Sequence, residues 1–364
     1  MFTMLIINPG STSTKIALWH DAEEIFSQTI IHTAQELKQL SGLADQFEYR
    51  KNLILDALLA HQIRLSDLSC IVARGGMLPP VHCGGYEVND EMIDFLTNHP
   101  RMEHASNLGA IIAAAIARPL NIPAYIYDAV VADEMPEIAH ITGFPEITRQ
   151  SFCHVLNSRA MARKAALQSG RSYEESNYVV AHLGGGISIS AHHKGHIIDS
   201  ISDDAGPFSP ERSGSTNLMY IVQMCYSGQF SKDEMLKKVR GNGGLKAYLG
   251  THDLIEIEHM IDSGNTLAQR LVEAMGLQIA KGIGSMLCVF RENVDGIILT
   301  GGLAYSQRLI TEITKTIPPY FPVIVLPGEK EMEALALGGL RIMSGQEKVH
   351  IFGKASYSGQ INIS

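Results

Sequence analysis

Two similar glycine turns, far apart in the chain, constrain the fold more than any other feature. The first lies in Ile-Ile-Asn-Pro-Gly-Ser-Thr-Ser-Thr-Lys-Ile-Ala-Leu at 6–18, and the second in Tyr-Val-Val-Ala-His-Leu-Gly-Gly-Gly-Ile-Ser-Ile-Ser at 178–190. Each turn joins an apolar strand to a second strand. Placing Gly10 on Gly184 gives an offset of 174 residues, close to half of the 364-residue chain. The repetition predicts two related halves.

The first turn has the chemistry of a phosphate-binding hairpin. Gly10 lets the backbone come close to an oxyanion, and Lys15 adds a compact positive charge. Ser11, Thr12 and Ser13 offer hydroxyl donors. The segment is not a Walker loop, because no Gly-Lys-Ser/Thr follows a glycine at the required spacing. An ordinary polar hairpin turn could carry the same residues, and the second copy is what favours phosphate binding.

A third glycine turn lies near the end of the chain, in Ile-Ile-Leu-Thr-Gly-Gly-Leu-Ala at 297–304. An apolar strand leads into Gly301 and Gly302, and a helix is expected from Tyr305. A strand followed by a glycine pair and a helix is a common nucleotide-contact geometry. We therefore expect both glycines to contact a nucleotide.

Composition excludes several classes of protein. The net charge of −9 and the pI near 5.9 argue against a general nucleic-acid or membrane binder, which would be basic. Five cysteines without CxxC spacing argue against a zinc site and against a disulfide framework. A cytoplasmic location is expected, since neither an export signal nor a membrane span is recognisable.

Strands and helices alternate in both halves, which predicts α/β domains whose sheets are covered by helices. We expect a first domain at 1–150 and a second at 151–330, with the ligand in a cleft between them. The helix at 331–345 is expected to return to the first domain. The sequence assigns no role to the tail at 346–364.

Three motifs together resemble the acetate/butyrate kinase family: Asn-Pro-Gly-Ser-Thr-Ser-Thr-Lys at 8–15, His-Leu-Gly-Gly-Gly at 182–186 and Arg-Ser-Gly at 212–214. Val-Ala-Arg-Gly-Gly at 72–76 and His-Ala-Ser-Asn-Leu-Gly at 104–109 are closest to the butyrate kinase branch. The resemblance implies two duplicated actin-like ATPase (ribonuclease H-like) domains. It also implies reversible, Mg²⁺-assisted transfer of phosphate from ATP to a short-chain fatty acid, butyrate above all, and a homodimer or larger homo-oligomer.

The family's site residues carry over onto matching positions of this chain. The first half is expected to contact the acyl substrate, and the second to bind the nucleotide and dimerise. Nucleotide and phosphate contacts fall on Asn8, Ser11, Ser13, Lys15, His182, Gly184, Gly185 and Gly186. Catalytic roles fall on Arg74, Asp128, His154 and Arg212, and a substrate contact falls on His104. Magnesium is assigned to Asp128 and Glu331, although Glu329 and Glu333 are close enough to leave that register open.

The chain departs from the family pattern near its predicted acyl site. Acetate kinases have an arginine where this chain has Ile71 and a histidine where it has Arg74, so we expect Arg74 to supply the charge from a shifted position. Ala73 and Cys153 replace larger residues, Val and Phe. If they line the acyl pocket, the space admits additional methylene groups, and a four- or five-carbon acid should be preferred to acetate.

Each assignment has a structural alternative. Asp128 could cap a helix, and His104 and His154 could be ordinary members of a set of 15 histidines. Arg212 could be an exposed loop residue, and the glutamates at 329–333 could form the acidic first turn of a helix. Two rival functions also stand. A sugar kinase would use Asp128 as a base toward a hydroxyl group, and an actin-like module could bind ATP without catalysis.

Overall fold

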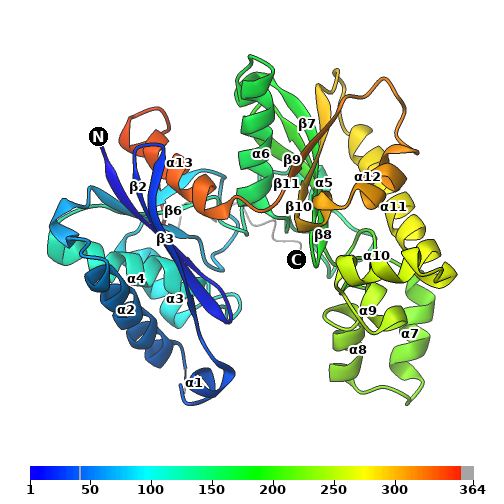
Figure 1. Ribbon diagram of the computed structural model, residues 1–364, viewed down its shortest axis with the longest axis horizontal. Coiled ribbons are helices and arrows are strands. Elements are labelled where there is room, and N and C mark those ends of the chain that lie inside the picture. The colour runs from blue at the N-terminus through cyan, green and yellow to red at the C-terminus, as the bar shows by residue number, and fades with distance from the viewer. Residues whose placement is uncertain (41, 354–364) are drawn as a thin grey trace. The chain divides into compact units, whose positions relative to one another are not determined.

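The computed structural model describes residues 1–40 and 42–353, and its described chain forms two compact units. The first unit contains Met1–Asp133 and the segment that begins at Lys330, and the second contains Glu134–Glu329. Each unit is built on its own β-sheet with helices packed against it (Figure 1). No helix in the described part of the chain is both long and apolar enough to span a membrane.

The first unit has a seven-stranded sheet in the order β12-β5-β6-β4-β1-β2-β3. Its strands are β1 Thr3–Pro9, β2 Ser13–His20, β3 Glu23–Ile31, β4 Cys70–Arg74, β5 Gly85–Glu87, β6 Ala124–Tyr127 and β12 His350–Ile351. Its helices are α1 Ala34–Lys38, α2 Leu43–Ala60, α3 Asp90–Asn98, α4 Asn107–Ala117 and α13 Glu331–Met343.

Helices cover both faces of this sheet, which explains why the central strands are continuous apolar runs. All seven residues of β1 are buried. Two glycines allow the helices to lie unusually close. A Cβ on Gly109 of α4 would lie 2.6 Å from the carbonyl oxygen of Arg74, and one on Gly339 of α13 would lie 2.5 Å from Cγ2 of Val72. Helix α13 therefore packs on the first sheet.

The second unit has a five-stranded sheet in the order β11-β10-β7-β8-β9. Its strands are β7 Asn177–Leu183, β8 Ile187–His193, β9 His196–Ile201, β10 Gly296–Gly301 and β11 Val323–Pro327. Its helices are α5 Glu137–His140, α6 Val155–Gln168, α7 Leu218–Tyr226, α8 Lys232–Val239, α9 Gly244–Leu249, α10 Leu254–Asp262, α11 Thr266–Leu287 and α12 Gln307–Thr314.

Five strands of the first sheet and the five strands of the second share one topology. In the first, β3-β2-β1 are antiparallel neighbours and β4 and β6 continue in parallel with β1. In the second, β9-β8-β7 are antiparallel and β10 and β11 continue in parallel with β7. The glycine turns at residues 10 and 184 occupy the same place in both, between the first two strands of each unit. The predicted duplication is therefore confirmed.

The unit boundaries differ from those expected at residues 150 and 330. The segment from Glu134 to Gln150 belongs to the second unit, because it pairs with β9. Arg149 binds the carboxylate of Asp199 at 2.5 Å, and the Glu134 carboxylate accepts the N–H of Ile197 at 3.4 Å. In the tail, His350–Ile351 pairs with β5, and Phe352 is buried. Residues 354–364 of the predicted tail lie outside the described residues.

Candidate active site

Three predicted site residues lie at the carboxyl ends of neighbouring parallel strands in the first unit. Asn8 is near the end of β1, Arg74 ends β4 and Asp128 directly follows β6. β1 pairs with β4, and β4 with β6. The carboxyl ends of parallel strands are where α/β proteins usually bind ligands. The sheet thus brings together residues that are 120 positions apart in sequence.

Glu331 connects two of these residues. Its Oε2 atom accepts a hydrogen bond from Nδ2 of Asn8 at 2.8 Å, and its carboxylate pairs with Nη1 of Arg74 at 3.1 Å. Glu331 is the first residue of α13, where the helix dipole favours a negative charge. The carboxylate therefore orients the Arg74 guanidinium. Of the three glutamates that the sequence left open, Glu331 is the one bonded to predicted site residues in this unit.

Asp128 has a backbone conformation that few non-glycine residues adopt. Its φ is 44°, and the residue is 3% exposed. Its Oδ1 atom accepts the N–H of Gly84 at 2.8 Å, and its own N–H donates to the Gly84 carbonyl. Such a conformation is costly and persists where the surrounding structure enforces it, often at functional sites. Asp128 caps no helix in the described chain, since α5 starts nine residues later.

The glycine hairpin presents its predicted ligands on one face of the sheet. Asn8 lies opposite Lys15 in the β1–β2 pair, so their side chains share a face, and Ser13 shares it by alternation. This is the face covered by α13, because Asn8 bonds to Glu331. Ser11 lies exposed in the turn. Three of the four predicted hairpin contacts are therefore on the same side.

The two predicted substrate residues of this unit, His104 and Ala73, differ in solvent exposure. His104 is exposed just before α4, and its Nδ1 accepts the N–H of Ser106 at 3.1 Å. A neutral His104 ring therefore carries its proton on Nε2. Ala73 is fully buried, and its Cβ faces Gly109 of α4. A pocket-lining role for Ala73 stays a prediction.

In the second unit, a buried amide determines the tautomer of His182. The Thr300 hydroxyl donates to the Gly328 carbonyl at 3.3 Å, so its oxygen is left to accept from Nδ2 of Asn157 at 3.2 Å. The same Nδ2 lies 3.0 Å from Nδ1 of His182. Nδ1 must then be the acceptor, and the neutral ring carries its proton on Nε2. That atom makes no hydrogen bond with the described residues, and Oε1 of Glu329 lies 3.4 Å away.

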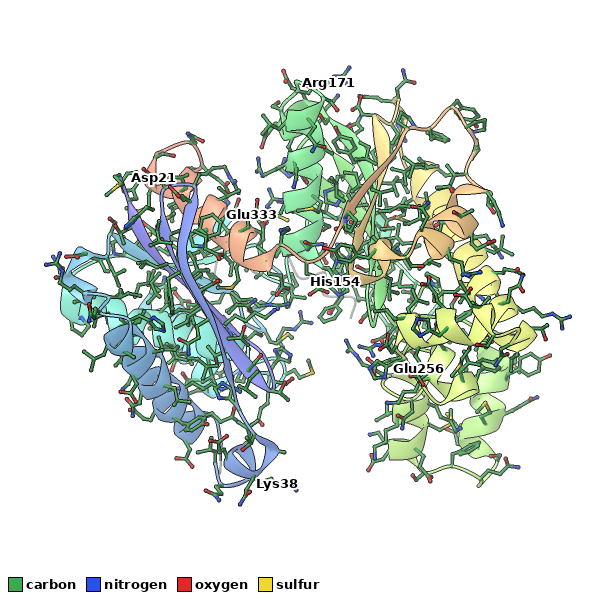
Figure 2. The ribbon with its side chains drawn as sticks, in the orientation of Figure 1. Asp21, Lys38, His154, Arg171, Glu256 and Glu333 are labelled. Carbon is green, nitrogen blue, oxygen red and sulfur yellow. The ribbon has the colours of Figure 1, made fainter. Side chains whose placement is uncertain are left out.

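His154 lies against this ring. It is the residue just before α6, where Figure 2 labels it, and its Nδ1 contacts Oγ of Ser188 at 2.7 Å. The imidazoles of His154 and His182 are stacked, with centroids 3.8 Å apart. Cys153, which precedes His154, is buried. Two predicted site histidines are therefore brought together, and a pocket-lining role for Cys153 stays a prediction.

The glycine turn at 184–186 is shaped by its neighbours. The Gly184 N–H donates to the Gly186 carbonyl, and a Cβ on Gly186 would lie 2.5 Å from Oδ2 of Asp203. A side chain at position 186 would displace that carboxylate. Gly301 has a φ of 90°, and a Cβ there would lie 2.4 Å from the Leu183 carbonyl oxygen. Both positions therefore require glycine for close approach of backbone or carboxylate.

Arg212 belongs to a charged cluster. Its Nε lies 3.6 Å from Oδ2 of Asp203 and 3.5 Å from Oδ1 of Asp204, and Arg240 pairs with the same two aspartates at 3.2 and 3.6 Å. Burial raises the pKa of Asp203, and Arg240 opposes this effect. The Arg212 side chain is 16% exposed, so it is not a free surface arginine. Asp203, Asp204 and Arg240 were not predicted from the sequence, although the two adjacent aspartates upstream of Arg212 were visible in it.

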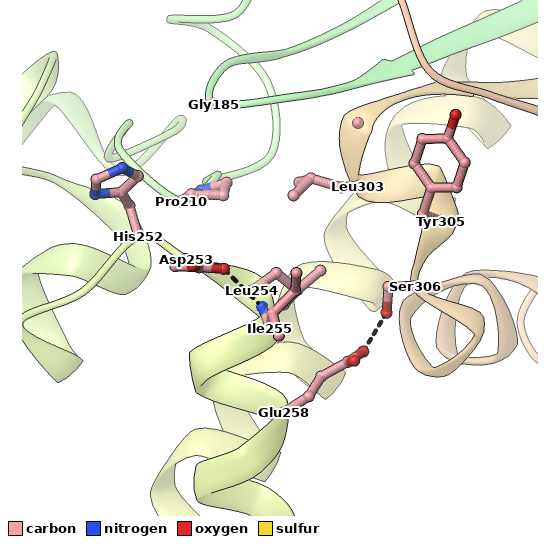
Figure 3. A pocket seen from close by; sticks show the side chains of 11 residues that line it. Gly185, Pro210, His252, Asp253, Leu254, Ile255, Glu258, Leu303, Tyr305 and Ser306 are labelled. Atoms are coloured by element: carbon pink, nitrogen blue, oxygen red, sulfur yellow. Dashed lines mark hydrogen bonds between the residues drawn. The ribbon is translucent and has the colours of Figure 1, made fainter.

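Next to the glycine turns, the second unit contains a cavity of about 660 Å³ (Figure 3). Gly185 from the β7–β8 turn and Gly302 from the turn after β10 both line it. The remaining wall is mixed in polarity: Pro210, His252, Asp253, Leu254, Ile255, Glu258, Leu303, Tyr305 and Ser306. Its volume is in the range of small-molecule and cofactor sites. The cavity therefore joins two turns that the sequence assigned to a nucleotide.

Comparison with known proteins decides the family. The model of the Acetokinase family matches residues 106–316, more than half of the chain. The chain belongs to the Acetokinase family. The resemblance seen in the sequence is thus confirmed, together with the predicted enzyme class, a kinase that phosphorylates a carboxyl group.

Relatives of this acetokinase-family protein match it over nearly its full length. Butyrate kinase 1 of Clostridium acetobutylicum is 44% identical over 350 residues, which cover 96% of this chain and 99% of the relative. Butyrate kinase 2 of the same organism is 45% identical, with 95% and 98% covered. Acetate kinase of Porphyromonas gingivalis has the same fold, with a TM-score of 0.77 at 17% identity over 94% of this chain and all of that one. The predicted fold is confirmed.

The carboxylates of the first unit are suited to magnesium. No three of the described His, Cys, Asp and Glu residues are grouped closely enough to hold an ion alone. Magnesium in kinases, however, needs only one or two carboxylates, with phosphate oxygens and water completing its shell. Asp128 and Glu331 each present carboxylate oxygens, the ligand type that Mg²⁺ prefers. Their donor chemistry fits the predicted ion.

Proposed function

We propose that this chain transfers the γ-phosphoryl group of ATP reversibly to the carboxylate of a short-chain fatty acid, with butyrate as the preferred acid. The observation that carries the proposal is the 44–45% identity to two butyrate kinases over almost the whole of each chain. The match covers 95–96% of this chain, so it extends over both units.

The chemistry requires neutralisation of charge more than proton transfer. A carboxylic acid with a pKa near ~4 is already an ionised nucleophile at neutral pH and needs no general base. The obstacle is that an anionic oxygen must approach an anionic phosphoryl group. Catalysis of such a step comes from positioning and electrostatic stabilisation of the transferring group.

Arg74 and Arg212 are suited to that task. A guanidinium stays charged, and its planar fork matches phosphate and carboxylate oxygens. Each is held by carboxylates of its own unit, Arg74 by Glu331 and Arg212 by Asp203 and Asp204. An arginine oriented before the reaction loses less side-chain freedom when it binds the transferring group.

The histidines would add hydrogen-bond donors. The Nε2–H of His182 makes no hydrogen bond with the described residues, and His154 stacks on the same ring. We assign His154 and His182 to oxygens of the phosphoryl group and the nucleotide. The cavity beside Gly185 and Gly302 has the size for the nucleoside part of ATP.

Magnesium, when bound, would neutralise charge on the nucleotide phosphates, and Asp128 and Glu331 would hold it. We further propose that the chain forms at least a homodimer through its second unit. Helix α7 supports this, since Leu218, Met219, Tyr220 and Tyr226 all lie exposed on it. Light scattering during size-exclusion chromatography measures the oligomeric state directly.

The kinase proposal is tested by trapping acyl phosphate as the hydroxamate, with ATP, Mg²⁺ and a panel of acetate, propionate, butyrate, isobutyrate, valerate and glycerol. A maximum at four carbons is the expected result. A maximum at acetate would retain the carboxylate kinase and remove the preference for butyrate. Glycerol-dependent release of ADP, with no hydroxamate from any of the acids, would overturn the proposal in favour of an alcohol kinase.

A further inference from the structure

One buried arginine forms hydrogen bonds to the turn of the phosphate-binding hairpin. Arg50 of α2 is 1% exposed. Its Nη1 donates to the carbonyl oxygens of Gly10 at 2.9 Å and Ser13 at 3.3 Å, and to Oγ1 of Thr14 at 3.0 Å. Its Nη2 donates to the carbonyl oxygen of Ser11 at 3.2 Å. A single guanidinium thus binds four oxygens within five consecutive residues.

This charge has no carboxylate partner. No described aspartate or glutamate forms an ion pair with Arg50, and its remaining hydrogen bond goes to the amide oxygen of Gln46 at 3.4 Å. Burial lowers the pKa of Arg50, but a guanidinium stays protonated near neutrality. A buried cation with only neutral partners is costly. A positive charge therefore lies directly behind the turn, not offset by any acidic side chain bound to it.

The carbonyl contacts also direct the turn's N–H groups. In a planar trans peptide, the C=O and the following N–H point in opposite directions. The Gly10 and Ser11 carbonyls point toward Arg50, so the N–H groups of Ser11 and Thr12 point away from it. Neither N–H donates to a described residue. Two backbone N–H groups that point away from Arg50 and have no described acceptor are suited to binding an anion.

Arg50 also leaves the ligand face of the hairpin free. Thr14 is buried on the side of Arg50, whereas the next residue, Lys15, points to the opposite face together with Asn8. That opposite face is covered by α13, while α2 and α4 lie on the other side of the sheet (Figure 1). Arg50 therefore supports the turn from the face that the predicted phosphate ligands do not use.

We infer that Arg50 is a positioning residue, which holds the turn from Gly10 to Ser13 in its phosphate-binding conformation and places a fixed positive charge behind it. The ligand would be the terminal phosphoryl group of ATP or of the acyl phosphate. This inference rests on the proposed kinase function. The two can be tested separately, because nucleotide affinity is measured without turnover.

The experiment compares wild type, Arg50→Met and Arg50→Lys by calorimetric titration with ATP and with AMP, which lacks the β- and γ-phosphates. Arg50→Met should weaken ATP binding about tenfold or more, by analogy with the loss of an oxyanion donor, and leave AMP binding unchanged. Arg50→Lys keeps the positive charge but not the planar guanidinium group. It should weaken ATP binding less than Arg50→Met does. Lys51→Met is the matched control, since it removes a charge from the next position of α2, where Lys51 pairs with Glu48 on the surface.

Stability and binding outcomes separate a positioning role from a structural one. A folded Arg50→Met protein with a lower Tm but wild-type ATP affinity would overturn the inference. If Arg50→Met does not fold, Arg50→Lys decides, because wild-type ATP affinity in the folded lysine variant would contradict the need for the fork. Absence of kinase activity in the wild type, with ATP binding intact, would instead count against the proposed function.

Discussion

The imidazole rings of His154 and His182 are stacked, with centroids 3.8 Å apart and planes inclined by 10°. His182 extends from the end of β7, and His154 precedes α6. Each ring has a partner at its Nδ1 atom, Asn157 for His182 and Ser188 for His154. Because Nδ1 of His182 is occupied, Nε2 is the atom of that ring left to face a ligand. The donor property of His182 then depends on Asn157.

Asn157→Asp should lower kcat about 10²-fold. An aspartate accepts at the position where the amide donates, so the neutral His182 ring would shift its proton to Nδ1 and lose the Nε2–H donor. The measurement is kcat at one fixed pH with saturating substrates, with Asn52→Asp on the exposed side of α2 as the matched control. A wild-type kcat in Asn157→Asp would contradict this role.

Arg212→Ala should reduce kcat by roughly 10²–10³, as expected for loss of a group that stabilises transition-state charge. Arg240→Ala should have a smaller effect, because Arg240 shares Asp203 and Asp204 with Arg212 and lies further toward the surface. The test is steady-state kinetics of both variants with saturating ATP and butyrate. Near-normal kcat in Arg212→Ala would remove this residue from the catalytic set.

The features that the sequence predicted are local ones. Strands β1, β2, β7, β8 and β10 were predicted from apolar runs that flank glycine turns. Such runs and turns can be recognised within short stretches of sequence. A final helix near 331–345 was also expected from the sequence, and α13 spans Glu331–Met343.

The missed features depend on contacts between distant residues. Arg240 lies 37 residues from Asp203, and no periodicity connects them. Arg50 lies within an ordinary helical pattern, and only the folded sheet shows that it points to the hairpin. The boundary near residue 133 was missed because it depends on the pairing of Glu134 and Arg149 with β9.

Glu331→Gln should raise the Mg²⁺ concentration that gives half-maximal activity several-fold. The amide keeps an acceptor for Asn8 but loses the charge that attracts both Mg²⁺ and Arg74. Glu333→Gln, in the same helical turn, and Glu329→Gln, just before the helix, are the matched variants (Figure 2 labels Glu333). The assay is rate against free Mg²⁺ at fixed ATP. If Glu329→Gln or Glu333→Gln alone changes the Mg²⁺ dependence, the assignment to Glu331 is wrong.

Ala73→Val should reduce kcat/KM for butyrate more than for acetate. Each buried methylene is worth about 0.8 kcal/mol, so losing space for two of them would cost roughly tenfold in the butyrate-to-acetate ratio. Cys70→Val is the matched control, because it adds volume at the other end of the same buried strand. The kcat/KM values for both acids are measured at saturating ATP. An unchanged ratio in a folded Ala73→Val protein would place Ala73 outside the acyl pocket.

His192 should make the second unit less stable in acid. Its ring is fully buried between the Tyr173 hydroxyl, 2.7 Å from Nδ1, and the Ser190 hydroxyl, 2.8 Å from Nε2. Burial, with a smaller contribution from Arg159, lowers the pKa of His192 from 6.5 to about 3. Between these values the unfolded chain binds a proton that the folded chain does not, so the free energy of unfolding falls as pH decreases from 6.5 toward 3.

The prediction for His192 is a difference between two pH values. By linkage, the wild type should lose about 2 kcal/mol of unfolding free energy at this site between pH 7 and pH 5. His192→Gln keeps polar atoms for Tyr173 and Ser190 but does not titrate, so its loss over that interval should be smaller by that amount. Urea denaturation at both pH values measures the loss, with His259→Gln as the exposed control. Equal losses in wild type and His192→Gln would mean that the buried ring accepts a proton without cost, against the desolvation argument.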